Sequence, residues 1–111
     1  MDTVAHDRDI IQRVLLSYAE TPYAYGTIQC KPVFDSLRNS FMLITEGWDE
    51  VKRIHGCVVH VEIVGEKVWV QRDDTDRGIT YELVAAGIPK DRIVLGFQEP
   101  SVRKFTGYAT A

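Results

Sequence analysis

Two β-rich runs separated by a glycine constrain the fold of this chain more than any other feature. The runs cover residues 53–64 and 67–72, and Gly65 lies between them. Glycine tolerates a positive φ, so it suits the first central position of a type II′ turn with a two-residue loop. The stretch therefore predicts a β-hairpin in which Val64 lies opposite Lys67.

The alternation of side chains along a strand assigns each residue of this hairpin to one of two faces. One face is almost wholly apolar and carries Cys57 and the cross-strand pairs Ile63–Val68, Val61–Val70 and Val59–Arg72. The other face is mixed and carries the pairs Glu62–Trp69 and His60–Gln71. A slip by one residue would exchange the faces, so the pattern itself fixes the register. We expect the apolar face in the core and the mixed face semi-exposed or against a partner.

An amphipathic helix over residues 3–19 is expected before the sheet. Its apolar residues recur with helical spacing and form one stripe: Ile10, Ile11, Val14, Leu15 and Tyr18. Asp2 or Thr3 can cap the start of this helix. Pro22 is expected to end it, because proline disfavours the α conformation in the residue before it.

Two further strands are expected between this helix and the hairpin. The first covers residues 27–34 and contains Pro32, which cannot donate to a ladder, so this strand lies at an edge or carries a bulge. The second covers residues 41–48, and its apolar first half favours burial on both faces. Residues 47–50 are expected to form the next turn. Together with the hairpin, these strands make a four-stranded antiparallel meander.

Shorter elements follow the hairpin. Residues 78–86 predict a helix that Gly87 and Pro89 end. The apolar run 93–97 is a strand or a buried loop, and residues 100–106 favour a final helical turn.

The predicted fold class is α+β, in a single domain over residues 1–111. It consists of an N-terminal helix, the meander sheet, and then a short C-terminal helix and turns. The net charge of −3 provides no general attraction to nucleic acid or anionic membranes. No apolar run is long enough to span a bilayer, and the acidic N-terminus is unlike a signal peptide. Two cysteines without disulfide or zinc spacing favour a reducing cytoplasm, and no cofactor is expected.

Acidic residues offer the main candidates for metal chemistry. Asp73, Asp74 and Asp76 have the oxygen ligands that Mg²⁺ or Ca²⁺ prefer, but their spacing is not that of a calcium loop. Capping of the following helix is the preferred interpretation. His55 and His60 lie five residues apart on one strand, so they point to opposite faces and cannot chelate one ion without a bulge.

A nuclease is the second catalytic possibility. Glu50 and Lys52 match the acid-x-lysine fragment of many nucleases, and Asp35 is the one plausible upstream metal ligand. Solvation of a charged turn is the preferred explanation of the fragment. Cys57 is expected among buried valines, where a thiolate is disfavoured. Basic residues are scattered, so DNA is expected to be contacted only indirectly or weakly.

The remaining candidate is a contact surface. Its residues are aromatic or polar and share the mixed face or its surroundings: Trp48, His60, Glu62, Trp69 and Gln71. Tyr23 and Tyr25 extend the aromatic set. Aromatic residues are enriched at interface hot spots, but the two tryptophans could instead cover the sheet beneath a helix or loop.

Motifs along nearly the whole chain resemble the XisI family, named for the fdxN element excision controlling factor. They are residues 22–26 (PYAYG), 34–35 (FD), 47–48 (GW), 53–56 (RIHG) with His60, 68–71 (VWVQ) with Asp73 and Thr75, 78–79 (GI), 87–89 (GIP), 93–97 (IVLGF) and Pro100. The departures are small: Asp76 where the family often has Glu, Thr80 where it has a small apolar residue, and a more polar C-terminus.

The resemblance implies a compact α+β fold and a role in DNA rearrangement. The namesake controls programmed excision of a DNA element during heterocyst differentiation in filamentous bacteria, together with a partner called XisH, while a separate recombinase performs the strand chemistry. We therefore expect a non-catalytic regulatory protein with an XisH-like partner that forms a homodimer. The alternative is a metal-dependent nuclease or other DNA-processing enzyme using the acidic residues above.

Overall fold

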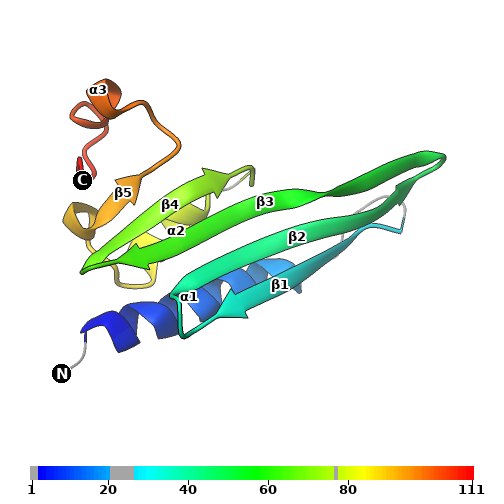
Figure 1. Ribbon diagram of the computed structural model, residues 1–111, viewed down its shortest axis with the longest axis horizontal. Coiled ribbons are helices and arrows are strands. Elements are labelled where there is room, and N and C mark those ends of the chain that lie inside the picture. Colours follow the sequence, from blue (N-terminus) through cyan, green and yellow to red (C-terminus); the bar gives the residue numbers. More distant parts are fainter. Residues whose placement is uncertain (1–2, 21–26, 77) are drawn as a thin grey trace.

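The fold is one sheet with its two longer helices on one face, seen in a computed structural model that describes residues 3–20, 27–76 and 78–111 (Figure 1). Its elements in chain order are α1 (Thr3–Ala19), β1 (Gln29–Asp35), β2 (Ser40–Asp49), β3 (Lys52–Val64), β4 (Lys67–Asp73), α2 (Ile79–Ala85), a 3-10 turn (Lys90–Arg92), β5 (Ile93–Leu95) and α3 (Pro100–Arg103). Asp2, Pro22, Tyr23 and Tyr25, to which the sequence assigned roles, lie outside the described residues.

The predicted meander is present and is extended by a fifth strand. The strand order is β1-β2-β3-β4-β5, with antiparallel pairing throughout except between β4 and β5, which are parallel. The apolar run from Ile93 is thus a strand: α2 carries the chain across the sheet, and a crossover of this kind returns the next strand parallel. β1 is an edge strand, as Pro32 predicted.

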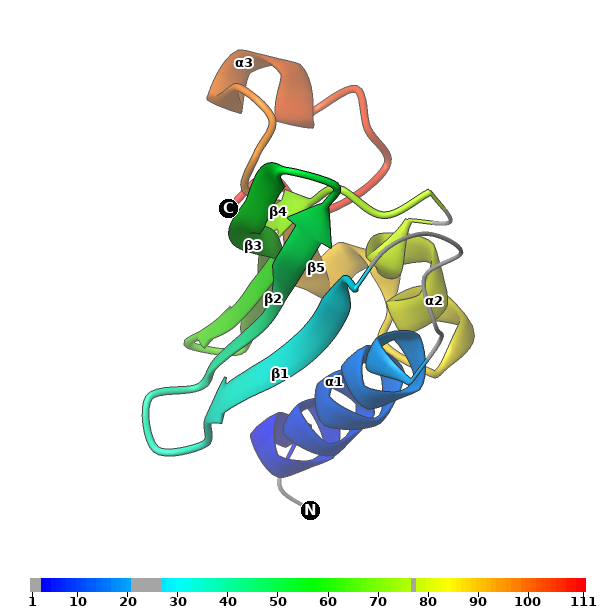
Figure 2. The same cartoon turned by 90° about the vertical axis from the view of Figure 1, so that its right-hand side faces the viewer.

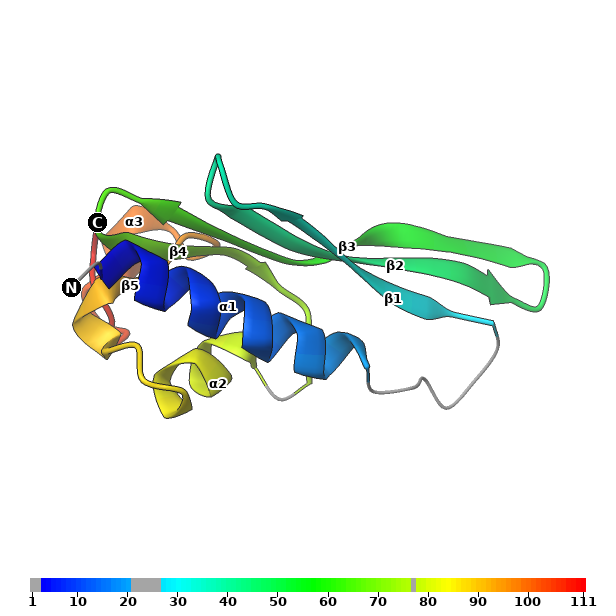
Figure 3. The same cartoon turned by 90° about the horizontal axis from the view of Figure 1, so that it is seen from below.

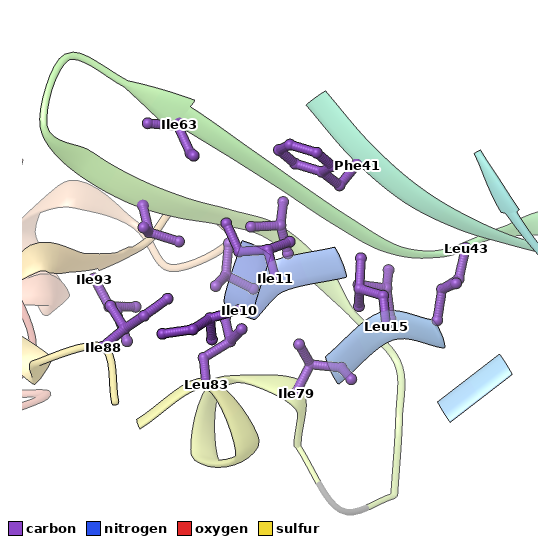
Figure 4. Close-up of a cluster of buried hydrophobic side chains, with 14 of the residues drawn as sticks. Ile10, Ile11, Leu15, Phe41, Leu43, Ile63, Ile79, Leu83, Ile88 and Ile93 are labelled. Carbon is purple, nitrogen blue, oxygen red and sulfur yellow. The ribbon is translucent and has the colours of Figure 1, made fainter. Parts of the chain in front are cut away.

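α1 and α2 lie on one side of the sheet, and the segment with α3 lies on the other (Figures 2 and 3). We call the side with α1 and α2 the inner face and the opposite side the outer face. α1 has the predicted bounds, and its residues Ile10, Ile11 and Leu15 are buried. They pack against inner-face side chains such as Phe41 and Leu43 (Figure 4).

The β3–β4 hairpin has the predicted turn and most of the predicted register. Gly65 has φ 63°, Val64 pairs with Lys67, and the pairing holds out to Val61 with Val70. Beyond that point a bulge shifts the register, so His60 pairs with Arg72 and Val59 with Asp73. The predicted pairs His60–Gln71 and Val59–Arg72 are therefore wrong. A bulge adds one unpaired residue, which alternation alone does not reveal.

A second register shift, between Leu43 and Ile44 of β2, corrects the placement of Cys57. Leu43 pairs with Val59, but Ile44 pairs with Cys57, so Val58 is the extra residue. Cys57 therefore shares the outer face with Ile44 and is half-buried rather than part of the apolar core face.

β2 and β3 continue well beyond the region that β4 covers. β2 runs through Asp49, and the turn is Glu50-Val51, so the turn predicted at residues 47–50 is displaced toward the C-terminus. Burial alternates along β2 from Ser40 to Gly47, which corrects the expected burial of its first half on both faces. We call the end of this hairpin, residues 44–57, the arm; it extends past the end of α1 (Figure 3).

A buried ion pair attaches α1 to the 3-10 turn before β5. Asp7 of α1 is 1% exposed, and its carboxylate accepts hydrogen bonds from both Nη atoms of Arg92 in a bidentate ion pair. The distance from Nη2 to Oδ1 is 2.9 Å. This pair raises the pKa of Arg92, chiefly through the hydrogen bond to Asp7. Among the described residues, no helix is long and apolar enough to cross a membrane.

Candidate functional site

Four of the five predicted contact residues lie close together on the outer face. Glu62 pairs with Trp69 on one side and with Ser40 on the other, and His60 and Gln71 are their neighbours along β3 and β4. Trp48 pairs with Arg53 in the arm, six positions along β2 from Met42, the residue opposite His60. At about 3.3 Å per residue this places Trp48 roughly 20 Å away, so the five do not form one surface.

Side-chain hydrogen bonds connect the polar members of this group. Ser40 Oγ lies 3.1 Å from His60 Nε2. Gln71 Nε2 donates to Glu62 Oε1 at 3.2 Å, and the same carboxylate oxygen lies 3.9 Å from His60 Nε2. We call Ser40, His60, Glu62 and Gln71 the outer-face cluster. Sequence reasoning missed Ser40, which only the β2–β3 register brings opposite Glu62.

The geometry of the outer-face cluster is unlike that of a nucleophilic triad. In a triad the carboxylate orients the histidine through one ring nitrogen while the nucleophile uses the other. Here Ser40 and Glu62 both approach Nε2 of His60. The side chains of His60 and Glu62 are 30% and 34% exposed, so the cluster offers hydrogen-bonding groups to a molecule that contacts this face.

Trp69 is half-buried beneath the C-terminal segment. The Arg103 guanidinium lies 5.1 Å from the centre of its ring. Gly96 crosses so close that an added Cβ would lie 3.1 Å from Trp69 Cε3 and 2.5 Å from Gln71 Oε1. Trp69 thus has the arrangement that the alternative interpretation foresaw, a tryptophan covering the sheet beneath a loop. Nothing in the sequence near Trp69 signals Arg103, which lies 34 positions away.

Trp48 occupies a different environment near the tip of the arm. Its side chain is 48% exposed, and the Arg53 guanidinium lies 5.3 Å from the ring centre. Arg53 also approaches Glu46, which forms a close ion pair with Lys31. The hydrogen bond from Lys31 is the main reason why the pKa of Glu46 lies below its usual value.

Asp73 and Asp74, two of the three acidic residues considered for metal binding, are used in local structure. Asp73 Oδ1 accepts hydrogen bonds from Thr75, and its Oδ2 accepts the backbone N–H of Ile79 at 2.7 Å. Asp74 binds the Arg72 guanidinium at 2.8 Å. The capping interpretation of Asp73 is confirmed, and within residues 3–20, 27–76 and 78–111 no group of three potential ligands is placed to hold a metal ion.

The proposed nuclease set is separated by the length of β2. Asp35 pairs with Ser40 at one end of that strand, whereas Glu50 and Lys52 follow its other end. The nine intervening positions correspond to about 30 Å. Asp35 instead accepts the backbone N–H groups of the following turn, and the hydrogen bond from Arg38 N–H contributes most to lowering its pKa.

The two strand histidines lie on the same face, contrary to the expected arrangement. The extra residue Val58 reverses the alternation, so His55 opposite Glu46 and His60 opposite Met42 both point outward. Their partners are four positions apart on β2, about 13 Å, which is too far to share a metal ion.

The comparisons with known proteins agree with this fold over nearly the full chain. The family model described as XisI protein matches residues 1–110. A crystal structure of a XisI-like protein from Anabaena variabilis is 32% identical, covers 97% of this chain and 99% of its own, and has a TM-score of 0.88. The structure of the fdxN element excision controlling factor XisI from the same organism is 32% identical, with coverages of 99% and 100% and a TM-score of 0.84. No curated protein matches significantly.

Proposed function

This chain belongs to the XisI family, and we propose that it is a regulatory protein that controls the excision of a DNA element and does not itself cut DNA. The observation that carries the proposal is the match, end to end, to a protein named the fdxN element excision controlling factor XisI. At 32% identity with nearly complete coverage, the relative and this chain share the whole domain and not one grafted segment.

The geometry of the candidate residues supports a role other than catalysis. The carboxylates considered for a nuclease lie at opposite ends of β2, and Asp73 is occupied as a helix cap. In the outer-face cluster, serine and carboxylate approach the same histidine nitrogen. Such groups recognise a partner by hydrogen bonding more readily than they activate a nucleophile.

In this proposal the protein acts with an XisH-like partner in the cytoplasm, contacts DNA only indirectly or weakly, and forms a homo-oligomer. The outer-face cluster is the surface we assign to the partner, because His60 and Glu62 are partly exposed there. The net charge of −3 supports indirect contact, since phosphate backbones attract cationic proteins.

Co-purification with an XisH-like protein tests the assignment. The variant Glu62→Lys reverses a charge within the outer-face cluster and should weaken the complex at least about tenfold, which corresponds to about 1.4 kcal/mol. Glu20→Lys, at the end of α1, makes the same charge change away from the outer face and should leave binding unchanged. Trp69 is a poorer probe, because a charged residue there would also disturb the packing of Arg103 and Gly96.

Two results would overturn the proposal at different levels. Normal binding by a folded Glu62→Lys variant would remove the outer-face cluster as the partner surface. Cleavage of DNA by the pure protein in Mg²⁺ or Mn²⁺ would remove the regulatory role and restore the nuclease alternative.

A further inference from the structure

Along the arm, one edge of β3 has no neighbouring strand among the described residues. Pairing between β3 and β4 ends at Val59 opposite Asp73, and the last bond across this boundary runs from Asp74 N to Val58 O at 2.8 Å. From Lys52 to Cys57, β3 pairs with β2 alone in the part of the chain that the structure describes (Figure 1). We call residues 52–57 the open edge.

The hydrogen-bonding groups on the open edge can be assigned from the turn. Asp49 and Lys52 flank a two-residue loop, so they form a hydrogen-bonded pair. Residues then alternate between bonding β2 and facing away from it. Ile54 bonds toward β2, whereas the backbone N–H and C=O of Arg53 and His55 point away from the sheet, and both residues are exposed.

The other two edges of the sheet carry devices that prevent further pairing. On β1, Pro32 lacks an N–H group and Lys31 adds a charge. On β5, a parallel bridge between Val94 and Ala109 covers the strand. The open edge has no proline, and within residues 3–20, 27–76 and 78–111 no bridge of this kind covers it. An uncovered strand edge is a ready template for another strand.

The charges at the two ends of the open edge are opposite. The ionisable side chains of the open edge are Lys52, Arg53 and His55, while the acids of the tip, Asp49 and Glu50, lie on β2 and in the turn. At the other end the chain leaves β4 through Asp74 and Asp76, both exposed, of which Asp74 also binds Arg72. A two-fold rotation exchanges these ends, so the edge is complementary to itself.

Exposed apolar side chains at the tip favour the same arrangement. Val51 is 93% exposed and Trp48 is 48% exposed. In an antiparallel pair of arms, each tip reaches the point where β4 of the other copy ends. The pairing would then bring Val51, the most exposed apolar residue of the tip, against the second copy.

We propose that a second copy of this chain pairs with the open edge, antiparallel and about a two-fold axis near Ile54, so that two sheets join into one. This pairing places Arg53 opposite His55 of the second copy, and it places Lys52 opposite Gly56, next to the end of β4 where Asp74 lies. The inference specifies the surface of the homo-oligomer in the proposed function. It does not depend on excision control, because its tests measure assembly of the pure protein.

A proline at the centre of the open edge provides the first test. His55→Pro removes the outward N–H group but leaves the bonds from Ile54 and Gly56 to β2, and proline is tolerated at strand edges. His55→Ala keeps the N–H group and is the matched control. Sedimentation equilibrium should show a dimer for the native chain and His55→Ala, and at least a tenfold larger dissociation constant for His55→Pro. A monomeric native chain, or an unchanged dimer in folded His55→Pro, would overturn the proposal.

A charge exchange tests the register. Lys52→Asp and Asp74→Lys should each weaken the dimer severalfold, and the double variant should recover most of the loss because the opposite charges are restored across the interface. Losses that simply add in the double variant would contradict the proposed register.

Hydrogen exchange measured by NMR on the native chain needs no variant. In the dimer, the amides of Arg53 and His55 should be protected, and dilution below the dissociation constant should release them, whereas Ile54 stays protected at both concentrations. A dimer in which Arg53 and His55 exchange rapidly uses another surface. If these amides become protected only when a strand from a different protein binds, that protein and not a second copy of this chain pairs with the open edge.

Discussion

The body of the molecule and the arm are built from the same two strands but stabilised in different ways. In the body, β2 and β3 lie between β1 and β4 and are covered by α1, so that Phe41 and Val61 are fully buried. In the arm, beyond the register shift at Val58, the strands lose β4 and the helical cover. β2 and β3 pair with each other in both regions, but the residues that they contribute to the buried apolar core all come from the body.

The largest effect is expected in the body. Phe41→Ala removes a fully buried ring that meets Phe34 edge-on at 5.7 Å between centroids. Deleting a buried aromatic ring loses its transfer free energy and leaves a cavity, which together cost about 3–5 kcal/mol of unfolding free energy. Urea unfolding monitored by circular dichroism measures this loss. A change below about 1 kcal/mol would mean that the body is not packed as described.

The next effect concerns the ion pair beneath α1. Asp7→Ala leaves the Arg92 guanidinium without its partner, and 78% of that side chain lies out of solvent, since 22% is exposed. Removing one member of a buried pair costs about 3–5 kcal/mol, and the partial exposure of Arg92 places the expected loss near 2–3 kcal/mol. The control is Asp9→Ala, which removes an exposed i,i+4 ion pair with Arg13. Thermal unfolding of the two variants should show a larger loss of stability for the buried pair than for the exposed one. Equal losses would contradict the assigned burial.

Gly47, although it lies in the arm, is expected to be as sensitive to substitution as residues of the body. At Gly47 an added Cβ would lie 2.3 Å from the backbone oxygen of Thr27 and 2.6 Å from Ile28 Cα. Because backbone atoms cannot simply rotate away, Gly47→Ala should cost about 1–3 kcal/mol. Gly56→Ala is the matched control, because no atom of the described residues lies within 4 Å of its added Cβ. A neutral Gly47→Ala would show that residues 27–28 do not cross the arm there.

The smallest effect is expected at the tip. Val51→Ser changes a side chain that is 93% exposed, so the unfolding free energy of the isolated chain should stay within about 0.5 kcal/mol. If the tip contacts a second copy, the same variant should weaken the dimer while leaving the stability of the isolated chain unchanged. A loss of intrinsic stability would show that Val51 packs within its own chain.

Local sequence rules were sufficient where short segments determine the structure. Gly65 specified its turn, the apolar stripe from Ile10 specified α1, and Pro32 specified an edge. The bulges were not predictable, because an alternating pattern looks the same whether or not Val58 or Gln71 is the extra residue. Their cause is the fit of long twisted strands to their neighbours.

The candidate surface was predictable only in part, because its surroundings come from distant segments. The hairpin register correctly placed Glu62 opposite Trp69. The contacts that decide what Trp69 does, however, come from Gly96 and Arg103, beyond the reach of local pattern. The grouping with Trp48 was wrong because β2 is long enough to separate two aromatic residues of one face.

The ion pair between Asp7 and Arg92 also has a consequence for the order of folding. The two residues are 85 positions apart, whereas each hairpin of the meander joins residues that are close in sequence. Contacts over long sequence separation form later, because closing a large loop costs more entropy. During synthesis, α1 leaves the ribosome first but gains this contact only after Arg92 emerges. The ion pair is therefore expected to form late, after the apolar residues of α1 have already packed against β2.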